Sequence, residues 1–332
     1  MMEINKKIAK RWSRMGPRAV YGKVMATIAK ENDDVLLMSA DLGRSSGLAS
    51  FYQNHPERFV NVGIAEQNMI GVAAGMTRVD YKVYASTFAP FASMRAAEQV
   101  RMNMGYMHEP VKLVALGSGL AMGFLGNSHF GLEDVAVMKT IPDLTIISPA
   151  DCIELDKVMN ATLNYDHPVY IRLTGTVNSP IVYEDDYDFE IGKPNWIIEK
   201  GLINVIAMGT TVGQAKQAVD RLNAEGYNIG LLNMHTIKPF NKEIVLDGIK
   251  ASKQLFIFEE HTKVGGLVSS IYELLIEENI TSVDVVTKSL PDQYLETGEY
   301  EYLISLYGLD GESIYNQMKE NIERMSNAQA ST

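Results

Sequence analysis

The chain has 332 residues, of which 46% are apolar and 21% charged, a composition typical of folded globular proteins. Its 30 Lys and Arg against 41 Asp and Glu give a net charge of −11, which argues against nucleic acid or an anionic membrane as partner. One cysteine, Cys152, excludes a disulfide framework. No apolar run reaches the ~20 residues of a membrane span, and MMEINKKIAKRW lacks the apolar segment of a secretory signal, so we expect a cytoplasmic protein of two domains.

The first half of the chain alternates short β-branched runs with longer stretches of helical spacing. This alternation is typical of an α/β fold with a parallel or mostly parallel sheet covered on both faces. Strands are predicted at residues 35–40, 59–63, 82–87, 111–116, 144–150 and 169–173.

A second α/β series follows a stretch rich in proline, glycine and acidic residues, which we interpret as an exposed linker between domains. Gly226 and Asn241 fit the end of one helix and the start of the next. We therefore predict an N-terminal segment at 1–17, a first domain at 18–175, a linker at 176–194 and a second domain at 195–332. Strands of the second domain are predicted at 202–209, 228–234, 254–260 and 282–288, and helices near 211–226, 241–251, 265–279 and 311–326.

The segment NVGIAEQNMIGVAAGM, residues 61–76, carries the first chemical signal. Glu66 begins a helix whose other residues are nearly all apolar or small, and we expect that helix to be buried. An acid at a helix N-terminus is also explained by the helix dipole, so capping is the alternative role. Gly71 and Gly75 would let a second backbone approach closely, either within the domain or across an interface between chains.

The motif GIAEQN, preceded by SADLGRSS and followed by STFAPF and GFLGNSHFGLED, resembles transketolase and more closely the C-terminal subunit of a split transketolase. The resemblance covers nearly the whole chain. It implies a pyrimidine-binding domain, a transketolase C-terminal domain and thiamine diphosphate as cofactor. It also implies that Glu66 hydrogen-bonds a ring nitrogen of the cofactor's aminopyrimidine, a role in which a carboxyl group shares a proton with a weakly basic ring.

Further positions match cofactor and reaction residues of that family. Phe88 and Phe91 match the aromatic pocket around the aminopyrimidine, although two core aromatics would show the same spacing. Asp41 matches an acid of the cofactor pocket or caps its own loop. His129 matches the histidine beside the reacting carbons, where it would hydrogen-bond a substrate hydroxyl, or it is a turn residue.

The resemblance also implies a site for an anionic sugar. Arg18, Ser45 and Arg172 match the two arginines and the serine with which transketolases hold a sugar phosphate. Arginine suits this role because its planar fork makes paired, charge-assisted hydrogen bonds. A sulfonate would satisfy the same donors, so the sequence leaves both anions open.

Two positions depart from the family pattern. Ordinary transketolases carry an Asp four residues before the loop histidine and another His near the start of the loop, and these positions fall on Leu125 and Gly117 here. Both family residues contact substrate hydroxyls. We interpret the departure as a substrate that is deoxygenated, inverted or otherwise modified near its reacting end, or as a loss of activity.

The chain lacks the Gly-Asp-Gly segment with which the family binds a divalent metal and the cofactor's diphosphate. We therefore expect a separate N-terminal subunit to carry that segment with Mg²⁺ or Ca²⁺, and the resemblance implies a heterotetramer. The alternatives are a 1-deoxyxylulose-5-phosphate synthase-like subunit, a 2-oxo-acid dehydrogenase beta-type subunit and a non-catalytic partner subunit.

Overall fold

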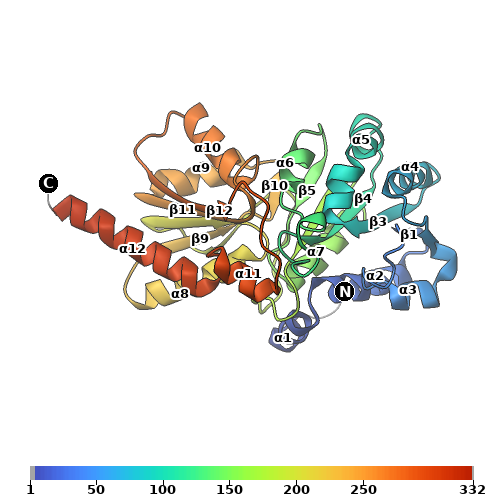
Figure 1. Ribbon diagram of the computed structural model, residues 1–332, viewed down its shortest axis with the longest axis horizontal. Coiled ribbons are helices and arrows are strands. Elements are labelled where there is room, and N and C mark those ends of the chain that lie inside the picture. Colours follow the sequence, from blue (N-terminus) through green and yellow to red (C-terminus); the bar gives the residue numbers. More distant parts are fainter. Residues whose placement is uncertain (1–3, 331–332) are drawn as a thin grey trace.

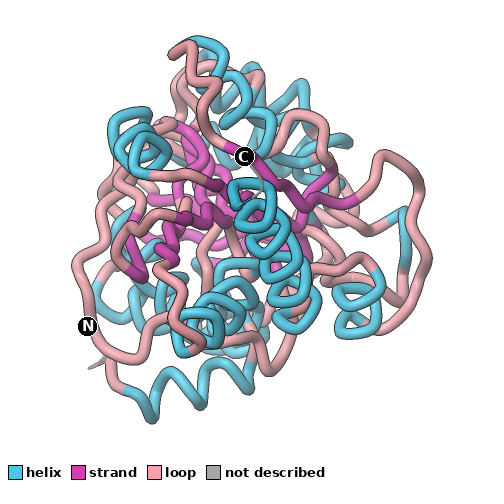
Figure 2. The backbone as a smooth tube through the Cα atoms, turned by 90° about the vertical axis from the view of Figure 1, so that its left-hand side faces the viewer, coloured by secondary structure: helices cyan, strands magenta, loops and turns pink. Residues whose placement is uncertain are grey.

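The computed structural model describes residues 4–330 and builds them into two α/β domains side by side (Figure 1). The predicted N-terminal segment and second domain extend beyond this range, so residues 1–3 and 331–332 of those predictions lie outside the described residues. Strands occupy the middle of the molecule and helices cover both sides (Figure 2).

The first domain is built on a seven-stranded sheet in the order β10-β5-β6-β4-β3-β1-β2, parallel except for β10. Its central strands are entirely buried, as their near-continuous apolar sequences require of a sheet covered on both faces. The strands are β1 (Val35–Ser39), β2 (Phe59–Asn61), β3 (Lys82–Phe88), β4 (Lys112–Ser118), β5 (Thr145–Ile147), β6 (Val169–Thr174) and β10 (Thr236–Lys238). The helices are α1 (Lys6–Met15), α2 (Pro17–Glu31), α3 (Ala49–Asn54), α4 (Glu66–Thr77), α5 (Ala97–Gln99), α6 (Asp134–Lys139) and α7 (Cys152–Thr162).

The second domain holds a five-stranded sheet in the order β12-β11-β8-β9-β7, with β7 antiparallel to β9. Asn241 caps α9 by accepting from the Ile244 amide, and Gly226 follows α8 with φ +98, so both predicted helix boundaries are confirmed. The strands are β7 (Asn195–Ile198), β8 (Ile203–Ala207), β9 (Ile229–Asn233), β11 (Gln254–Thr262) and β12 (Asp284–Leu290). The helices are α8 (Thr211–Ala224), α9 (Lys242–Ala251), α10 (Leu267–Glu277), α11 (Tyr300–Leu306) and α12 (Gly311–Ala330).

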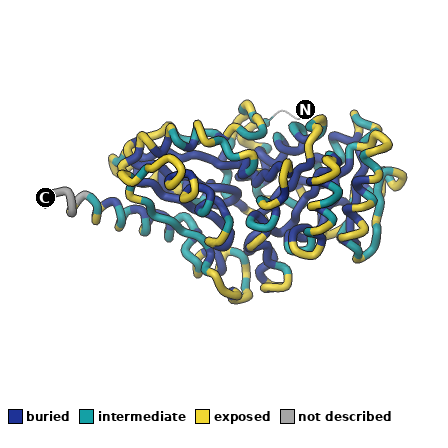
Figure 3. The backbone as a smooth tube through the Cα atoms, turned by 90° about the horizontal axis from the view of Figure 1, so that it is seen from above, coloured by how far each residue is buried: buried dark blue, intermediate teal, exposed yellow. Residues whose placement is uncertain are grey.

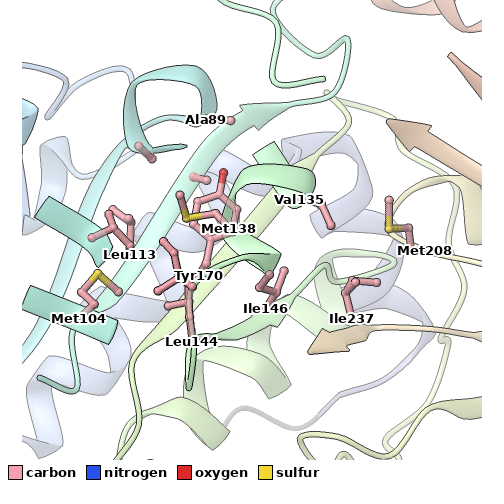
Figure 4. Close-up of a cluster of buried hydrophobic side chains, with 14 of the residues drawn as sticks. Ala89, Met104, Leu113, Val135, Met138, Leu144, Ile146, Tyr170, Met208 and Ile237 are labelled. Atoms are coloured by element: carbon pink, nitrogen blue, oxygen red, sulfur yellow. The ribbon is translucent and has the colours of Figure 1, made fainter. Parts of the chain in front are cut away.

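The two domains are joined more closely than the sequence predicts. Strand β10 lies within the second half of the chain, yet it pairs antiparallel with β5 and extends the first sheet. Apolar side chains continue across the junction, where Met208 and Ile237 lie beside Val135 and Ile146 in one core (Figure 4). A continuous apolar core of this kind opposes free rotation of one domain against the other.

The linker at 176–194 is exposed in part, and its aromatic residues pack against both domains. Tyr183 and Tyr187 stack at a centroid distance of 3.9 Å, and both hydroxyls donate to Glu154 of the first domain. Asn233 of the second domain donates to the same carboxylate and to the Tyr183 hydroxyl. The two tyrosines therefore attach the linker to both domains. The sequence did not predict this attachment, because the acidic residues around them favour an exposed segment.

Candidate active site at the edge of the first sheet

The first sheet reverses its strand order at β1, which pairs with β2 on one side and β3 on the other. In open α/β sheets, ligands bind outside the carboxyl ends of the strands at such a reversal. Asp41 follows β1, Glu66 begins α4 after β2, and Phe88 ends β3. The topology thus brings these three predicted cofactor residues together at the carboxyl ends of the strands, which we call the edge of the sheet.

Glu66 is the buried acid of this edge, with 3% of its side chain exposed. Arg95 Nη1 donates to both carboxylate oxygens, at 2.9 Å each. A carboxylate also gains from its place in the first turn of α4 through the helix dipole. Its carboxylate is nevertheless paired with the Arg95 guanidinium.

Two aromatic rings and an imidazole form a cluster beside this ion pair. The ring centroids of Phe88 and Phe91 lie 6.1 Å apart at an edge-on angle, and His129 lies 5.6 and 5.2 Å from them. The Arg95 guanidinium lies over Phe91, 3.9 Å from the ring centroid. The structure therefore brings Glu66, both phenylalanines and His129 together around Arg95.

The surroundings of His129 favour the neutral form of its imidazole. Partial burial lowers its pKa, and the positive charge of Arg95 lowers it further. Nδ1 is 2.9 Å from the hydroxyl of Ser128, which fixes the orientation of the ring. A neutral imidazole offers one donor and one acceptor to a neighbouring hydroxyl.

A wide helical turn places Arg95 in the site. Residues Phe91–Arg95 form a π-helical turn, closed by the Ala96 amide donating to the Phe91 carbonyl at 3.2 Å. Such turns insert an extra residue and recur at functional sites. The sequence motifs assign no role to Arg95.

Asp41 is fixed by a neighbour that the sequence motifs do not reveal. Its backbone is left-handed, with φ +60, which is uncommon for a residue other than glycine. Asn61 Oδ1 accepts from the amides of Asp41 and Gly63 at 3.0 Å each. Asn61 thereby ties the loop after β1 to the turn that leads into Glu66, and its place at the end of a strand was the signal available in the sequence.

Ser45 belongs to this loop, and the backbone of Arg18 lies against Gly47 of the same loop. Ser45 is exposed in a groove that Arg44, Tyr52 and Asp41 also line. Arg18, on α2, is partly buried, which lowers its pKa, and no described residue hydrogen-bonds or pairs with its guanidinium. A partly desolvated cation without a partner is costly, so this position suits an anion from outside the chain.

Arg172 does not join the site, which corrects its prediction as a substrate ligand. It is 0% exposed, its Nε donates to both carboxylate oxygens of Asp134 at 3.0 and 2.9 Å, and its Nη2 donates to the carbonyls of Gly131 and Glu260. A buried guanidinium with these partners holds the domains together. The sequence could not separate this role from an anion site, because both end a strand with arginine.

One of the two positions that depart from the family pattern has a local structural reason. Gly117 has φ +63, and a Cβ there would lie 2.6 Å from Met122 Cγ, so a histidine does not fit. Leu125 is 40% exposed and Phe124 is 66% exposed. The loop that carries His129 therefore exposes two neighbouring apolar side chains.

The helix α4 is not buried on all sides, contrary to the sequence prediction. Gly71 and Gly75 are exposed, and a Cβ at either would have no neighbour within 4 Å. Ile64 and Met94 nearby are 77% and 57% exposed. In the view of Figure 3, by contrast, buried residues run through the middle of both domains.

The described part of the chain offers neither a metal cluster nor a membrane-spanning helix. Among residues 4–330, no three or more His, Cys, Asp or Glu side chains gather in a group that could hold a metal ion. No helix in that range has the length and apolar character needed to cross a membrane.

The sequence matches two family descriptions: "Transketolase, pyrimidine binding domain" over residues 14–176 and "Transketolase, C-terminal domain" over residues 197–314. It is 32% identical to a subunit of the apulose-4-phosphate transketolase of Phocaeicola vulgatus, over 92% of this chain and 97% of that one. It is 33% identical to a 6-deoxy-6-sulfo-D-fructose transketolase subunit of Clostridium sp. (strain MSTE9), over 92% and 94%.

The fold is also found in a solved structure described as a split gene transketolase, inactive beta4 tetramer. The TM-score is 0.81 and the identity 32%, over 92% of this chain and 98% of that one. The match extends through both domains. The chain therefore belongs to the transketolase family and has its pyrimidine-binding and C-terminal domains.

Proposed function

We propose that this chain is the pyrimidine-binding subunit of a two-chain transketolase that transfers a two-carbon ketol unit between anionic sugars. The observation that carries this proposal is the cluster of Glu66, Phe88, Phe91 and His129 at the strand-order reversal. A separate subunit would hold the diphosphate of thiamine diphosphate together with Mg²⁺ or Ca²⁺.

The site has the chemistry that an aminopyrimidine requires. The buried carboxylate of Glu66 already accepts hydrogen bonds from a flat, nitrogen-bearing group, the Arg95 guanidinium, which lies over Phe91. A protonated pyrimidine ring is likewise flat and donates from nitrogen, so the same carboxylate and the same ring face fit it. The residues present therefore fit the group.

Each residue of the cluster would have its own task. Thiamine diphosphate, when bound, supplies the nucleophilic carbon that carries the two-carbon unit. Glu66 would hold a proton against a ring nitrogen, while Phe88 and Phe91 orient the ring and exclude water. His129 would hydrogen-bond a substrate hydroxyl through its neutral imidazole, and Asp41 would line the pocket beside the loop after β1.

The need for a second subunit is supported by the open side of the site. A Cβ at Gly71 or Gly75 would have no neighbour, and Ile64 and Met94 expose large apolar surfaces there. We assign this surface of α4 to the subunit that carries Gly-Asp-Gly, with two copies of each chain in a heterotetramer. The related beta4 tetramer described as inactive is consistent with a chain that needs such a partner.

The substrate would be a sugar phosphate or a sugar sulfonate. Arg18 lacks a partner among the described residues, and Ser45 lies exposed beside Arg44, so these three donors would face the anion. Relatives named for a phosphate and for a sulfo sugar share this family architecture. Leu125 cannot bind a hydroxyl, so fructose 6-phosphate and xylulose 5-phosphate would be poor substrates. Normal transketolase efficiency on these two sugars would contradict that specificity.

The test is reconstitution with a Gly-Asp-Gly subunit from the same source. We expect the two chains to co-purify, to bind thiamine diphosphate with a divalent metal and to transfer ketol units. Glu66→Ala should lower turnover by about 10²–10⁴-fold, the usual range for a lost acid–base group, without preventing assembly. Glu98→Ala, which removes an exposed carboxylate paired with Arg101, is the matched control. Unchanged turnover in Glu66→Ala would indicate a non-catalytic subunit, and pyruvate decarboxylation without ketol transfer would indicate a different enzyme.

A further inference from the structure

We propose that Arg95 is an internal placeholder for the aminopyrimidine: it occupies Glu66 and Phe91 in the unassembled chain and must leave when the cofactor is bound. This inference rests on the proposed function and assigns a positioning role to a residue that the site otherwise leaves without one. Its basis is the geometry around a single guanidinium.

Arg95 makes both contacts that we assign to the cofactor ring. Its Nη1 donates to both oxygens of Glu66 at 2.9 Å, and its guanidinium carbon lies 3.9 Å from the centroid of Phe91. A guanidinium is planar, carries N–H donors in its plane and stacks on aromatic faces. An aminopyrimidine protonated on its ring has the same three properties, so the two groups compete for the same carboxylate and the same ring.

The two partners of the ion pair differ in their freedom to move. Glu66 is 3% exposed, whereas Arg95 is 46% exposed. The carboxylate therefore cannot follow a departing partner, but the arginine can swing toward solvent at little cost in hydration. The π-helical turn at Phe91–Arg95 sets the position of the Arg95 backbone, so the side chain can leave Glu66 by rotation about its own bonds.

The ion pair between Arg95 and Glu66 stabilises the isolated subunit. Without Arg95, Glu66 would be a buried carboxylate with no charged partner, an arrangement that is expensive in a protein interior. With Arg95 in place, the pocket is occupied until the second subunit and cofactor arrive. Cofactor binding then draws on the fraction of molecules in which Arg95 has already left, so the apparent Kd exceeds the intrinsic Kd by the inverse of that fraction.

The direction of the effect separates a placeholder from a cofactor ligand. Removal of a competitor tightens cofactor binding, whereas removal of a ligand weakens it. If the competent state makes up about 10–30% of wild-type molecules, Arg95→Gln should tighten binding by roughly three- to tenfold. Arg95→Lys keeps a cation for Glu66 but lacks the planar face, so its affinity should lie between those of the wild type and Arg95→Gln.

The experiment is calorimetric titration of thiamine diphosphate, at saturating Mg²⁺, into the reconstituted two-chain complex carrying wild-type, Arg95→Gln or Arg95→Lys subunits. Arg101→Gln is the matched control, because Arg101 is an exposed arginine paired with Glu98 on the neighbouring turn. Thermal unfolding of each free subunit verifies folding, and Arg95→Gln should lower Tm more than Arg101→Gln does. Turnover does not enter the comparison.

Three outcomes decide the matter. Tighter binding in Arg95→Gln, with unchanged binding in Arg101→Gln, supports the placeholder. Weaker or unchanged binding in Arg95→Gln overturns it and leaves the proposed function intact. Absence of cofactor binding in the wild-type complex overturns the proposed function and the placeholder together.

Discussion

Two of the arginine–carboxylate pairs in this chain have opposite surroundings. Arg95 and Glu66 lie at the edge of the first sheet, where the arginine is 46% exposed. Arg172 and Asp134 lie between the domains, where neither side chain is exposed. In the first pair one partner can leave; in the second, water cannot replace either partner.

The second pair belongs to a polar network that joins the domains. The Glu260 carboxylate accepts from the Leu120 amide at 2.6 Å and from the hydroxyls of Thr210 and Tyr300. Leu120 lies in the loop that leads toward His129, so the second domain helps to hold a loop of the candidate site. An ion pair with one exposed partner is suited to exchange of that partner, and a pair with both partners buried is suited to fixed geometry.

The largest expected difference is in stability. Asp134→Asn leaves Arg172 as a buried charge without its counter-ion, so we expect a loss of about 3–5 kcal/mol in the free energy of unfolding. Glu66→Gln should cost about 1 kcal/mol or less, because Arg95 can turn to solvent. Urea unfolding of the free subunits measures both values. Equal losses in the two variants would contradict the contrast between the pairs.

The buried ring of His261, beside Asp134, should make the free energy of unfolding depend on pH. Burial lowers its pKa to about 4, although the charge of Asp134 opposes that shift, and Nε2 faces the Ala136 amide at 3.4 Å. Because the folded pKa lies below the unfolded value of 6.5, the stability from the neutral ring is present above pH 6.5 and is lost as the pH falls toward 4. The loss is on the order of 3 kcal/mol.

The measurement is urea unfolding at pH 7.5 and pH 4.5 for the wild type, His261→Gln and His108→Gln. His261→Gln removes the titrating group and should lose less stability than the wild type between these values. His108 is exposed, so its variant should follow the wild type. Identical pH profiles for wild type and His261→Gln would show that the ring does not titrate as expected.

The smallest expected effect on stability is at Leu125, on the exposed side of the site. Leu125→Asp should change the free energy of unfolding by about 0.5 kcal/mol or less, because Leu125 is 40% exposed. The new carboxylate can accept from a sugar hydroxyl, so preference for fructose 6-phosphate should rise by about tenfold in kcat/KM. Phe124→Ser, which removes the neighbouring apolar side chain, is the control. A stability loss above about 2 kcal/mol would place Leu125 in the core.

Much of the fold could be predicted because strand and helix periodicity is local. Every strand predicted in the two series is present, with its ends displaced by a few residues. Two short strands, β7 and β10, were missed, since each depends on pairing with a distant partner rather than on its own sequence. The helices α1 and α11 were also missed.

The candidate site was predicted unevenly for the same reason. Glu66, Phe88, Phe91 and His129 were identified from their motifs, and the structure brings them together. Asn61 and Arg95 were missed, because their roles depend on contacts across 20 and 29 positions of the chain. Arg172 was misplaced, because a strand-ending arginine has the same appearance whether it faces solvent or the other domain.

The sequence by itself determined the alternation of strands and helices, the family and the residue types available for chemistry. Only the tertiary structure decided which charges are exposed and which are buried, and therefore that Arg95 faces the site while Arg172 joins the domains. The physical reason is that the energy of a charge depends on the groups and the water around it, and those are set by chain segments far apart in sequence.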